Sequence, residues 1–158
     1  MEYTDIIISL RKILRAINLE NKRVEKESGI SIPQLLCLQF LSKQSGLSAS
    51  PKAIKEHLQL NASTVSGIVA RLDKKGLVAK LPNASDRRMY AIALTSKGDT
   101  LLKDAPPLLH QKLSLQLKNL SADKVVEIQD SIQLLVSMFD AEQLDAAPIV
   151  MLEDPAGK

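Results

Sequence analysis

Apolar residues recur at helical spacing along most of the chain. Between residues 4 and 27 they fall three or four positions apart, which predicts a helix whose second half is polar: Ile6, Leu10, Ile13, Leu14 and Ile17. Residues 31–44 predict a shorter and more apolar helix, with Ser31 as its N-cap and Pro33 in its first turn. The small and polar residues 45–50 predict a loop.

Two further helices are predicted in the middle of the chain, separated by a very short connection. The first begins with Ser50 as N-cap and Pro51 as first helical residue, and its core positions are Ile54 and Leu58. The second covers residues 61–76. A pair of short helices with a tight turn is typical of a helix-turn-helix, although two ordinary packed helices of an all-α domain would give the same pattern.

The helix over residues 61–76 has two different faces. Asn61 is a favourable N-cap, Gly76 suits the position after the last turn, and one face is an apolar stripe of Val65, Ile68, Val69 and Leu72. The opposite face is small and polar, with Ser63, Ser66, Gly67 and Ala70 flanked by Thr64, Arg71 and Lys74. Small residues permit close approach to another surface, and Ser, Thr and Arg can hydrogen-bond to bases and phosphates. This face therefore favours nucleic-acid contact.

Two β-favouring segments follow, residues 77–81 and 89–95, with the turn-rich run PNASDRR between them. A hairpin directly after a helix-turn-helix predicts a winged helix. Arginines at the tip of a wing have no core to fill and can reach a narrow DNA groove, so we expect the pair Arg87 and Arg88 to contact DNA. We expect Asp86 to brace one of the two arginines, Arg87 or Arg88, by a charge-assisted hydrogen bond. Alternatively, both arginines only solubilise the hairpin.

Residues 95–120 predict a helix that starts near Thr95. Pro106 and Pro107 fall inside it, and a proline in a helix interior bends or breaks the helix. We therefore expect a kink near residues 103–107.

The last predicted helix covers residues 121–144 and has Ser121 as its N-cap. Its apolar surface is wider than a monomer needs, since the stripe of Val125, Ile128, Ile132, Leu135 and Phe139 is joined by Val126, Leu134 and Met138. Together with residues 4–27, this surface predicts interlocking end helices in a homodimer. The alternative is that all these side chains fill one core. The tail, residues 145–158, either docks across the dimer or is loose.

Charge is distributed unevenly along the 158 residues, whose 45% hydrophobic content is ordinary for one globular domain. The net charge is only +3, yet residues 48–98 carry nine basic and three acidic groups. Residues 99–158 carry five basic and ten acidic groups. A basic central segment is the electrostatic pattern of a polyanion-binding protein.

Several other classes of protein are disfavoured. The chain has no apolar run long enough for a membrane helix, its charged N-terminus does not resemble a signal peptide, and a single cysteine makes no internal disulfide. We therefore expect a soluble, cytoplasmic protein without a membrane partner. No glycine-rich phosphate loop is present, and His57, His110 and Cys37 lack the spacing of a metal site, so we expect no enzyme, metal or cofactor. Cys37 favours core packing, with a redox sensor as the alternative.

The run from residue 28 to residue 100 resembles the multiple-antibiotic-resistance regulator (MarR) family. The matching features are Gln34, the run STVSGIVARLDKKGLV, SDRR in the wing and LTSKG before the next helix. The resemblance implies a mainly α fold with a small β-hairpin wing, in which a winged helix-turn-helix is flanked by long dimerisation helices. The implied divisions are an N-terminal dimerisation helix, the DNA-binding region, the C-terminal dimerisation helices and a tail: residues 1–28, 29–98, 99–144 and 145–158.

The same resemblance implies a dimeric transcriptional regulator, often a repressor, on a pseudo-palindromic operator in double-stranded DNA, with a small-molecule effector that releases it. Residues 61–75 would enter the major groove and the wing the minor groove. The implied DNA-binding residues are Ser63, Thr64, Ser66, Gly67, Arg71, Lys74, Asp86, Arg87 and Arg88. Gly67 departs from the family pattern, because many relatives carry a long, often basic residue there. The alternative function is a winged-helix module that binds protein and does not read DNA sequence.

Overall fold

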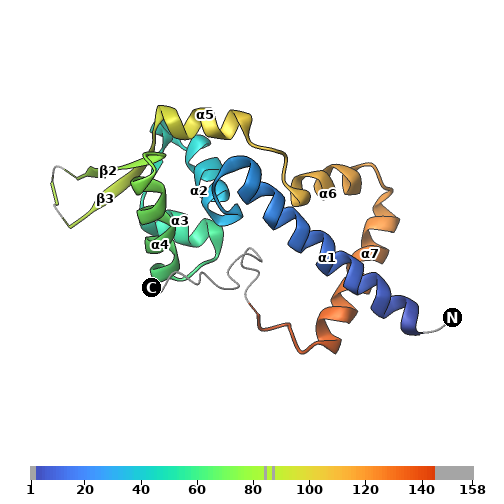
Figure 1. Ribbon diagram of the computed structural model, residues 1–158. Helices are drawn as coiled ribbons and strands as arrows, with labels where there is room; N and C mark the ends of the chain where they lie inside the picture. Colours follow the sequence, from blue (N-terminus) through green and yellow to red (C-terminus); the bar gives the residue numbers. More distant parts are fainter. Residues whose placement is uncertain (1–2, 84, 87, 145–158) are drawn as a thin grey trace, which may run out of the picture. The chain divides into compact units, whose positions relative to one another are not determined.

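The computed structural model describes residues 3–83, 85–86 and 88–144 (Figure 1). The chain divides into two compact units, one containing Met1–Pro106 and the other Pro107–Ala146. The first unit contains α1 (Tyr3–Ser28), α2 (Ile32–Ser42), a 3₁₀ turn η1 (Ser45–Leu47), β1 (Ser48–Ala49), α3 (Pro51–Leu58), α4 (Ala62–Lys74), β2 (Val78–Pro82), β3 (Tyr90–Leu94) and α5 (Ser96–Asp104). The second unit contains α6 (Leu109–Lys118) and α7 (Ala122–Met138).

The predicted N-caps are confirmed, because each begins its helix with a local hydrogen bond. The Ser31 hydroxyl accepts from the Gln34 N–H at 3.4 Å, and the Gln34 side chain accepts from the Ser31 N–H at 3.1 Å. Ser50 accepts from the Ala53 N–H at 3.1 Å. Gln34, singled out by the family resemblance, is therefore a buried capping residue of α2.

The core of the first unit lies between α2, α3, α4 and one face of the sheet. Its fully buried side chains come from all of these elements: Leu35, Leu38, Leu41, Ile54, Ile68, Leu72, Leu77, Val78 and Ile92. The stripe predicted for α4 is confirmed, since all four of its members are buried. Burial of this stripe fixes the rotation of α4, so its small polar face points outward.

The sheet has three antiparallel strands in the order β1-β3-β2, rather than the two strands expected. Residues 78 to 82 pair with residues 94 to 90 in the hairpin, and Ser48 pairs with Ala93. Residues 45–50 were therefore wrongly expected to be loop throughout. A strand of two residues is too short to show alternation, and it is stabilised by a partner far along the chain. Figure 1 shows the hairpin projecting from the helices of its unit.

The single kinked helix expected over residues 95–120 is two helices. Ala105 follows α5 in an extended conformation (φ −67°, ψ 140°), and α6 does not begin until Leu109. A residue before proline is driven out of the helical region, and here two prolines stand in succession. The last helix is also shorter than expected: α7 begins after the Ser121 cap but ends at Met138.

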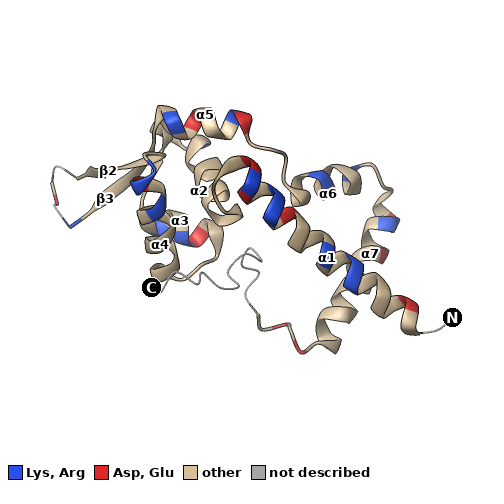
Figure 2. Cartoon of the chain, in the orientation of Figure 1, with Lys and Arg blue, Asp and Glu red and all other residues tan. Residues whose placement is uncertain are grey.

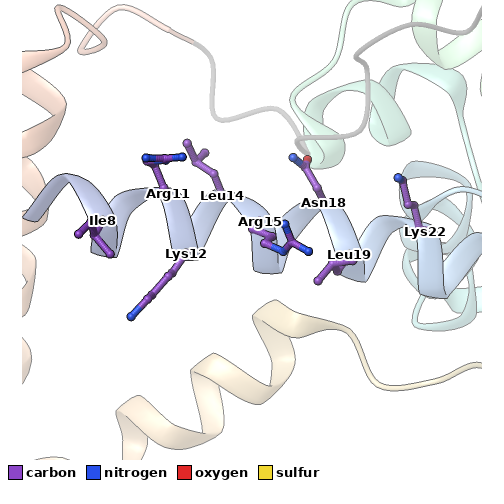
Figure 3. Close-up of a pocket in the computed structure, with 8 residues that line it drawn as sticks. All are labelled: Ile8, Arg11, Lys12, Leu14, Arg15, Asn18, Leu19 and Lys22. Carbon is purple, nitrogen blue, oxygen red and sulfur yellow. The ribbon is translucent and has the colours of Figure 1, made fainter. Parts of the chain in front are cut away.

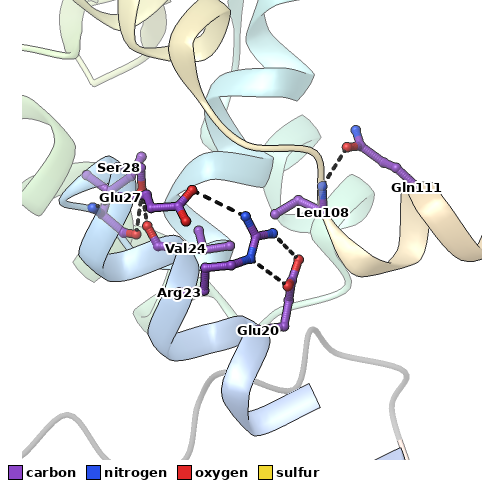
Figure 4. A network of polar contacts seen from close by, with 8 residues as sticks. Glu20, Arg23, Val24, Glu27, Ser28, Leu108 and Gln111 are labelled. Carbon is purple, nitrogen blue, oxygen red and sulfur yellow. Dashed lines mark hydrogen bonds and ion pairs between the residues drawn. The ribbon is translucent and has the colours of Figure 1, made fainter. Parts of the chain in front are cut away.

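The C-terminal half of α1 is organised by Arg23. Its Nε and Nη2 donate to the Glu20 carboxylate at 3.0 and 2.7 Å, and its Nη1 donates to Glu27 at 3.2 Å (Figure 4). These bonds, chiefly those to Glu20, raise the pKa of Arg23. In the second unit, the Gln111 side chain accepts from the Leu108 N–H at 2.9 Å and starts α6.

Candidate nucleic-acid interface

The turn between α3 and α4 is three residues long and has a defined geometry. Gln59 adopts a left-handed conformation (φ 53°) and ends α3, while its N–H donates to the Lys55 carbonyl. Asn61 then starts α4, and its side-chain oxygen accepts from the Thr64 N–H at 2.8 Å. This compact turn sets α4 against α3 as in a helix-turn-helix.

The outer face of α4 carries the residues that the sequence predicted for DNA contact. Four of them are exposed, namely Ser63, Ser66, Arg71 and Lys74, while Thr64 and Gly67 are partly buried; Ala70, on the same face, is also exposed. The Ser63 hydroxyl donates to the Asn61 side-chain oxygen at 2.7 Å. Its proton is therefore engaged, which leaves the Ser63 oxygen as an outward acceptor.

Gly67 and Arg71 form one structural feature of this face. A Cβ placed on Gly67 would lie 3.5 Å from Nη1 and 3.6 Å from Nη2 of Arg71. The guanidinium thus lies over the glycine, one turn nearer the N-terminus of α4 than its own Cα.

The tip of the hairpin is held by short polar bonds. The Asn83 side-chain oxygen accepts from the Ser85 N–H at 2.9 Å and from the Ser85 hydroxyl at 2.7 Å. The Asp86 carboxylate accepts from the backbone N–H of Arg88 at 2.9 Å. Arg87 lies outside the described residues, so its bracing by Asp86 and its contact with DNA stay predictions. Asp86 orders the turn through the Arg88 backbone.

Hydrogen bonds join the C-terminal end of α4 to the base of the hairpin. The Thr95 hydroxyl donates to the Gly76 carbonyl at 2.7 Å and accepts from the Gly98 N–H at 3.1 Å. The Lys97 ammonium donates to the Lys75 carbonyl at 2.7 Å, and Lys75 donates in turn to the Gly29 carbonyl. The Thr95 bond to Gly76 holds the base of the hairpin against the C-terminal end of α4, and the two lysine bonds tie that end to α5 and to the connection between α1 and α2.

A groove of about 350 Å³ lies beside α4, between α3 and the hairpin. Its lining includes Lys52, Lys55, Ser66, Lys80 and Tyr90. The Lys80 ammonium lies 5.6 Å from the centre of the Tyr90 ring, within cation–π range. Figure 2 shows basic positions on both α3 and α4.

Sequence reasoning did not name these three lysines as site residues. The spacing of Lys52 and Lys55 along one helix, within the basic central segment, was the available signal. The place of Lys80 opposite them depends on the packing of the hairpin, which no local pattern reveals.

Other candidate chemistry has a structural explanation. Cys37 is fully buried, and burial raises the pKa of its thiol to about 12. The thiol therefore stays protonated and unreactive, as expected for a residue that only packs in the core. His57 stacks on Phe40 with ring centres 4.2 Å apart, and His110 is exposed on α6. Within residues 3–83, 85–86 and 88–144, no group of His, Cys, Asp or Glu is arranged to hold a metal ion. No helix in that part of the chain has the length and hydropathy to cross a membrane.

Comparison with known proteins identifies the family. The MarR family profile matches residues 28–89. The HTH-type transcriptional repressor MdtR of Bacillus subtilis is 32% identical over 96 residues, which span 61% of this chain and 61% of MdtR. The HTH-type transcriptional repressor NicR of Pseudomonas putida is 32% identical over 115 residues, 70% of each chain.

A solved structure supports the same fold. The S. aureus MepR–DNA complex matches with a TM-score of 0.64 and 20% sequence identity, covering 87% of this chain and 98% of the MepR chain. The winged-helix fold predicted from the sequence is thereby confirmed, and the chain belongs to the MarR family of transcriptional regulators.

Proposed function

We propose that the protein is a homodimeric repressor of transcription that binds a pseudo-palindromic operator in double-stranded DNA. Membership of the family makes it a regulator and not an enzyme. The observation that carries the proposal is the exposed, small and polar face of α4 beside the lysines of α3 and the hairpin. The names of MdtR and NicR as repressors support the direction of regulation.

In the proposed complex, residues 61–75 enter the major groove. Ser63, Ser66 and Gly67 allow the helix backbone to approach the bases, and Lys74 lies at the C-terminal end, where it meets phosphate. The ammonium groups of Lys52 and Lys55 supply further phosphate contacts from α3. Arg87 enters the adjacent minor groove, while Arg88 supports the wing or touches the backbone.

The end helices provide the surface for the proposed dimer. Several apolar side chains of α1 are at least half exposed: Ile7, Ile13, Leu14 and Leu19. Figure 3 shows Leu14 and Leu19 on α1 together with Arg11, Lys12, Arg15 and Lys22. On α7, four apolar side chains are likewise at least half exposed: Val126, Ile132, Leu134 and Met138. Apolar surface of this extent indicates a protein partner, and a second copy supplies one by symmetry.

A dimer also explains how one small helix could select an operator. Two recognition helices related by a two-fold axis meet successive major grooves about one helical turn of DNA apart. The operator then repeats its half-site in inverted orientation. A small-molecule effector that binds better to a dimer with another spacing of these helices would release the DNA.

A binding titration tests the proposal. The full chain is titrated with a duplex from the region upstream of its own gene and with a scrambled duplex, at two salt concentrations. We expect selective binding whose log K falls with log salt by about 0.9 per phosphate neutralised. Equal binding to both duplexes would contradict a repressor that reads sequence, and absence of binding at low salt would favour the protein-binding alternative.

A further inference from the structure

The outer face of α4 lacks a long side chain at its centre. Ser63, Ser66, Gly67 and Ala70 recur along this face, and none can form two parallel hydrogen bonds to one base. The Ser63 hydroxyl already donates to Asn61, and Ala70 offers only a methyl group. The bidentate contact that identifies a guanine in the major groove needs two parallel donors, which these four residues do not supply.

Arg71 occupies the space that Gly67 leaves. The two terminal nitrogens of its guanidinium would lie 3.5 and 3.6 Å from a Cβ on Gly67, which is ordinary van der Waals distance. Helical side chains lean toward the N-terminus, so a residue at i+4 covers the surface above residue i. The glycine therefore permits the guanidinium to lie flat along the helix.

This placement moves the charge toward the half of the helix that reads bases. The N-terminal residues of a recognition helix contact base edges, whereas its C-terminal residues reach the phosphates. Arg71 is in the last turn of α4 by sequence, like Lys74. Its guanidinium, however, is displaced by one turn, about 5.4 Å, toward the middle of the outer face.

We propose that Arg71 is the specificity-determining residue of this interface and that it reads a guanine in each operator half-site. Its two parallel N–H groups donate to N7 and O6 of that guanine, from the position above Gly67. In this chain the arginine at 71 thus takes the place of a reading side chain at 67. The inference rests on the proposed function, because it requires α4 to lie in the major groove.

The test is a selection from a library of duplexes with a randomised 20-base-pair core, with full-length protein. Wild-type protein should enrich an inverted repeat that contains a fixed guanine in each half. Replacing that guanine by adenine should weaken binding roughly 5- to 150-fold, the range for one bidentate contact, and 7-deazaguanine, which lacks N7 but keeps O6, should weaken it by a smaller factor.

Variants at position 71 assign the contact. Arg71→Ala should enrich a motif without a preference at the guanine position and leave the other positions fixed. Arg71→Lys keeps the charge but not the planar fork, so it should retain the salt dependence while losing most of the guanine preference. Circular dichroism confirms that each variant is folded.

Two control variants separate recognition of a base from general electrostatic attraction to DNA. Lys74→Ala, which removes a charge from the same outer face, should weaken binding to all duplexes alike and leave the selected motif unchanged. Gly67→Ala should also keep the motif, because its Cβ fits beside the guanidinium, whereas Gly67→Gln should change the base preferred there.

The outcomes distinguish failure of this inference from failure of the proposed operator-binding function. If wild-type protein enriches no sequence, the proposed operator-binding function fails and the inference fails with it. If wild-type protein enriches a motif and Arg71→Ala enriches the same motif, the function stands and Arg71 is not the reading residue.

Discussion

The carbonyl oxygen of Leu77 occupies the space beside Gly98 in which any other residue would place its Cβ. That atom would stand 2.2 Å from the oxygen and 2.7 Å from Cδ1 of Leu94. Gly98 lies in the first turn of α5, and Leu77 precedes β2 at the base of the wing. The close approach of the two backbones packs α5 against the hairpin, which gives a physical role to the last residue of the LTSKG run.

Gly98→Ala should therefore destabilise the protein. The backbone must shift to relieve the contact, at a cost of about 1–3 kcal/mol in the free energy of unfolding, as for an overpacked core. Urea denaturation measures this change. A free energy of unfolding equal to that of the wild type would show that α5 and the hairpin separate at little cost.

Gly67→Ala is a matched control that should change the free energy of unfolding in the opposite direction. Both glycines are helical, but the Cβ at position 67 meets only the flexible end of Arg71 at 3.5 Å. Alanine is favoured over glycine in a helix, so the free energy of unfolding should rise by about 0.5–1 kcal/mol. Parallel urea titrations of the two variants check both signs, and a loss of stability in Gly67→Ala would contradict the geometry of this face.

Asn61→Ala should destabilise α4 at its N-terminus. The variant loses the acceptor for the Thr64 N–H at 2.8 Å and for the Ser63 hydroxyl at 2.7 Å. Loss of such a cap costs about 1 kcal/mol. Thermal unfolding followed by circular dichroism measures it, and Asn61→Asp, which keeps an acceptor, should restore most of the stability. Equal losses in both variants would mean that the cap bond is not the cause.

These local features are the ones that the sequence predicts best. The N-caps of Ser31, Ser50 and Asn61 bond to N–H groups three residues away, and the apolar stripe of α4 is visible within eight residues. In contrast, β1 exists because Ser48 pairs with Ala93, and the contact of Gly98 with Leu77 joins residues on either side of the whole hairpin. Such relationships depend on how the helices and strands pack against one another, and they leave no periodic pattern in the sequence.

In the candidate interface, too, the local features could be predicted from the sequence and the features that depend on packing could not. The outer face of α4 could be predicted because the buried stripe fixes the rotation of the helix. The position of the Arg71 guanidinium over Gly67, and that of Lys80 opposite Lys52, are side-chain arrangements in space. These positions could be found only from the folded structure.

Leu134→Glu tests the proposed dimer. Leu134 is 57% exposed on α7, so the substitution should cost the isolated chain little, but it would bury a charge in an apolar dimer interface. We expect a dissociation constant at least 10-fold weaker by sedimentation. Gln129→Glu adds the same charge at an exposed polar position of this helix and should leave association unchanged. A monomeric wild-type protein, or a Leu134→Glu dimer of unaltered affinity, would contradict the role of α7.

Cys37 gives the protein a specific dependence of stability on alkaline pH. Burial raises the pKa of its thiol from 9.0 to about 12, so the unfolded chain loses this proton at a lower pH than the folded chain. The neutral thiol is thus accommodated without cost below about pH 9, and stability is lost as the pH rises from 9 toward 12. At pH 10 the loss is about 1.4 kcal/mol, because pH 10 lies about one unit above the pKa of the unfolded thiol and one pKa unit corresponds to about 1.4 kcal/mol.

Lysine and tyrosine side chains titrate in the same range, so the measurement is a difference between wild type and Cys37→Ala. Urea denaturation at pH 8 and pH 10 should show a smaller loss of stability in the variant than in the wild type, even though the cavity lowers its stability at both pH values. A thiol reagent at pH 8 should also react with Cys37 far faster in urea than in buffer. Rapid reaction in the folded protein would show that Cys37 is accessible, and it would revive the redox-sensor alternative for this residue.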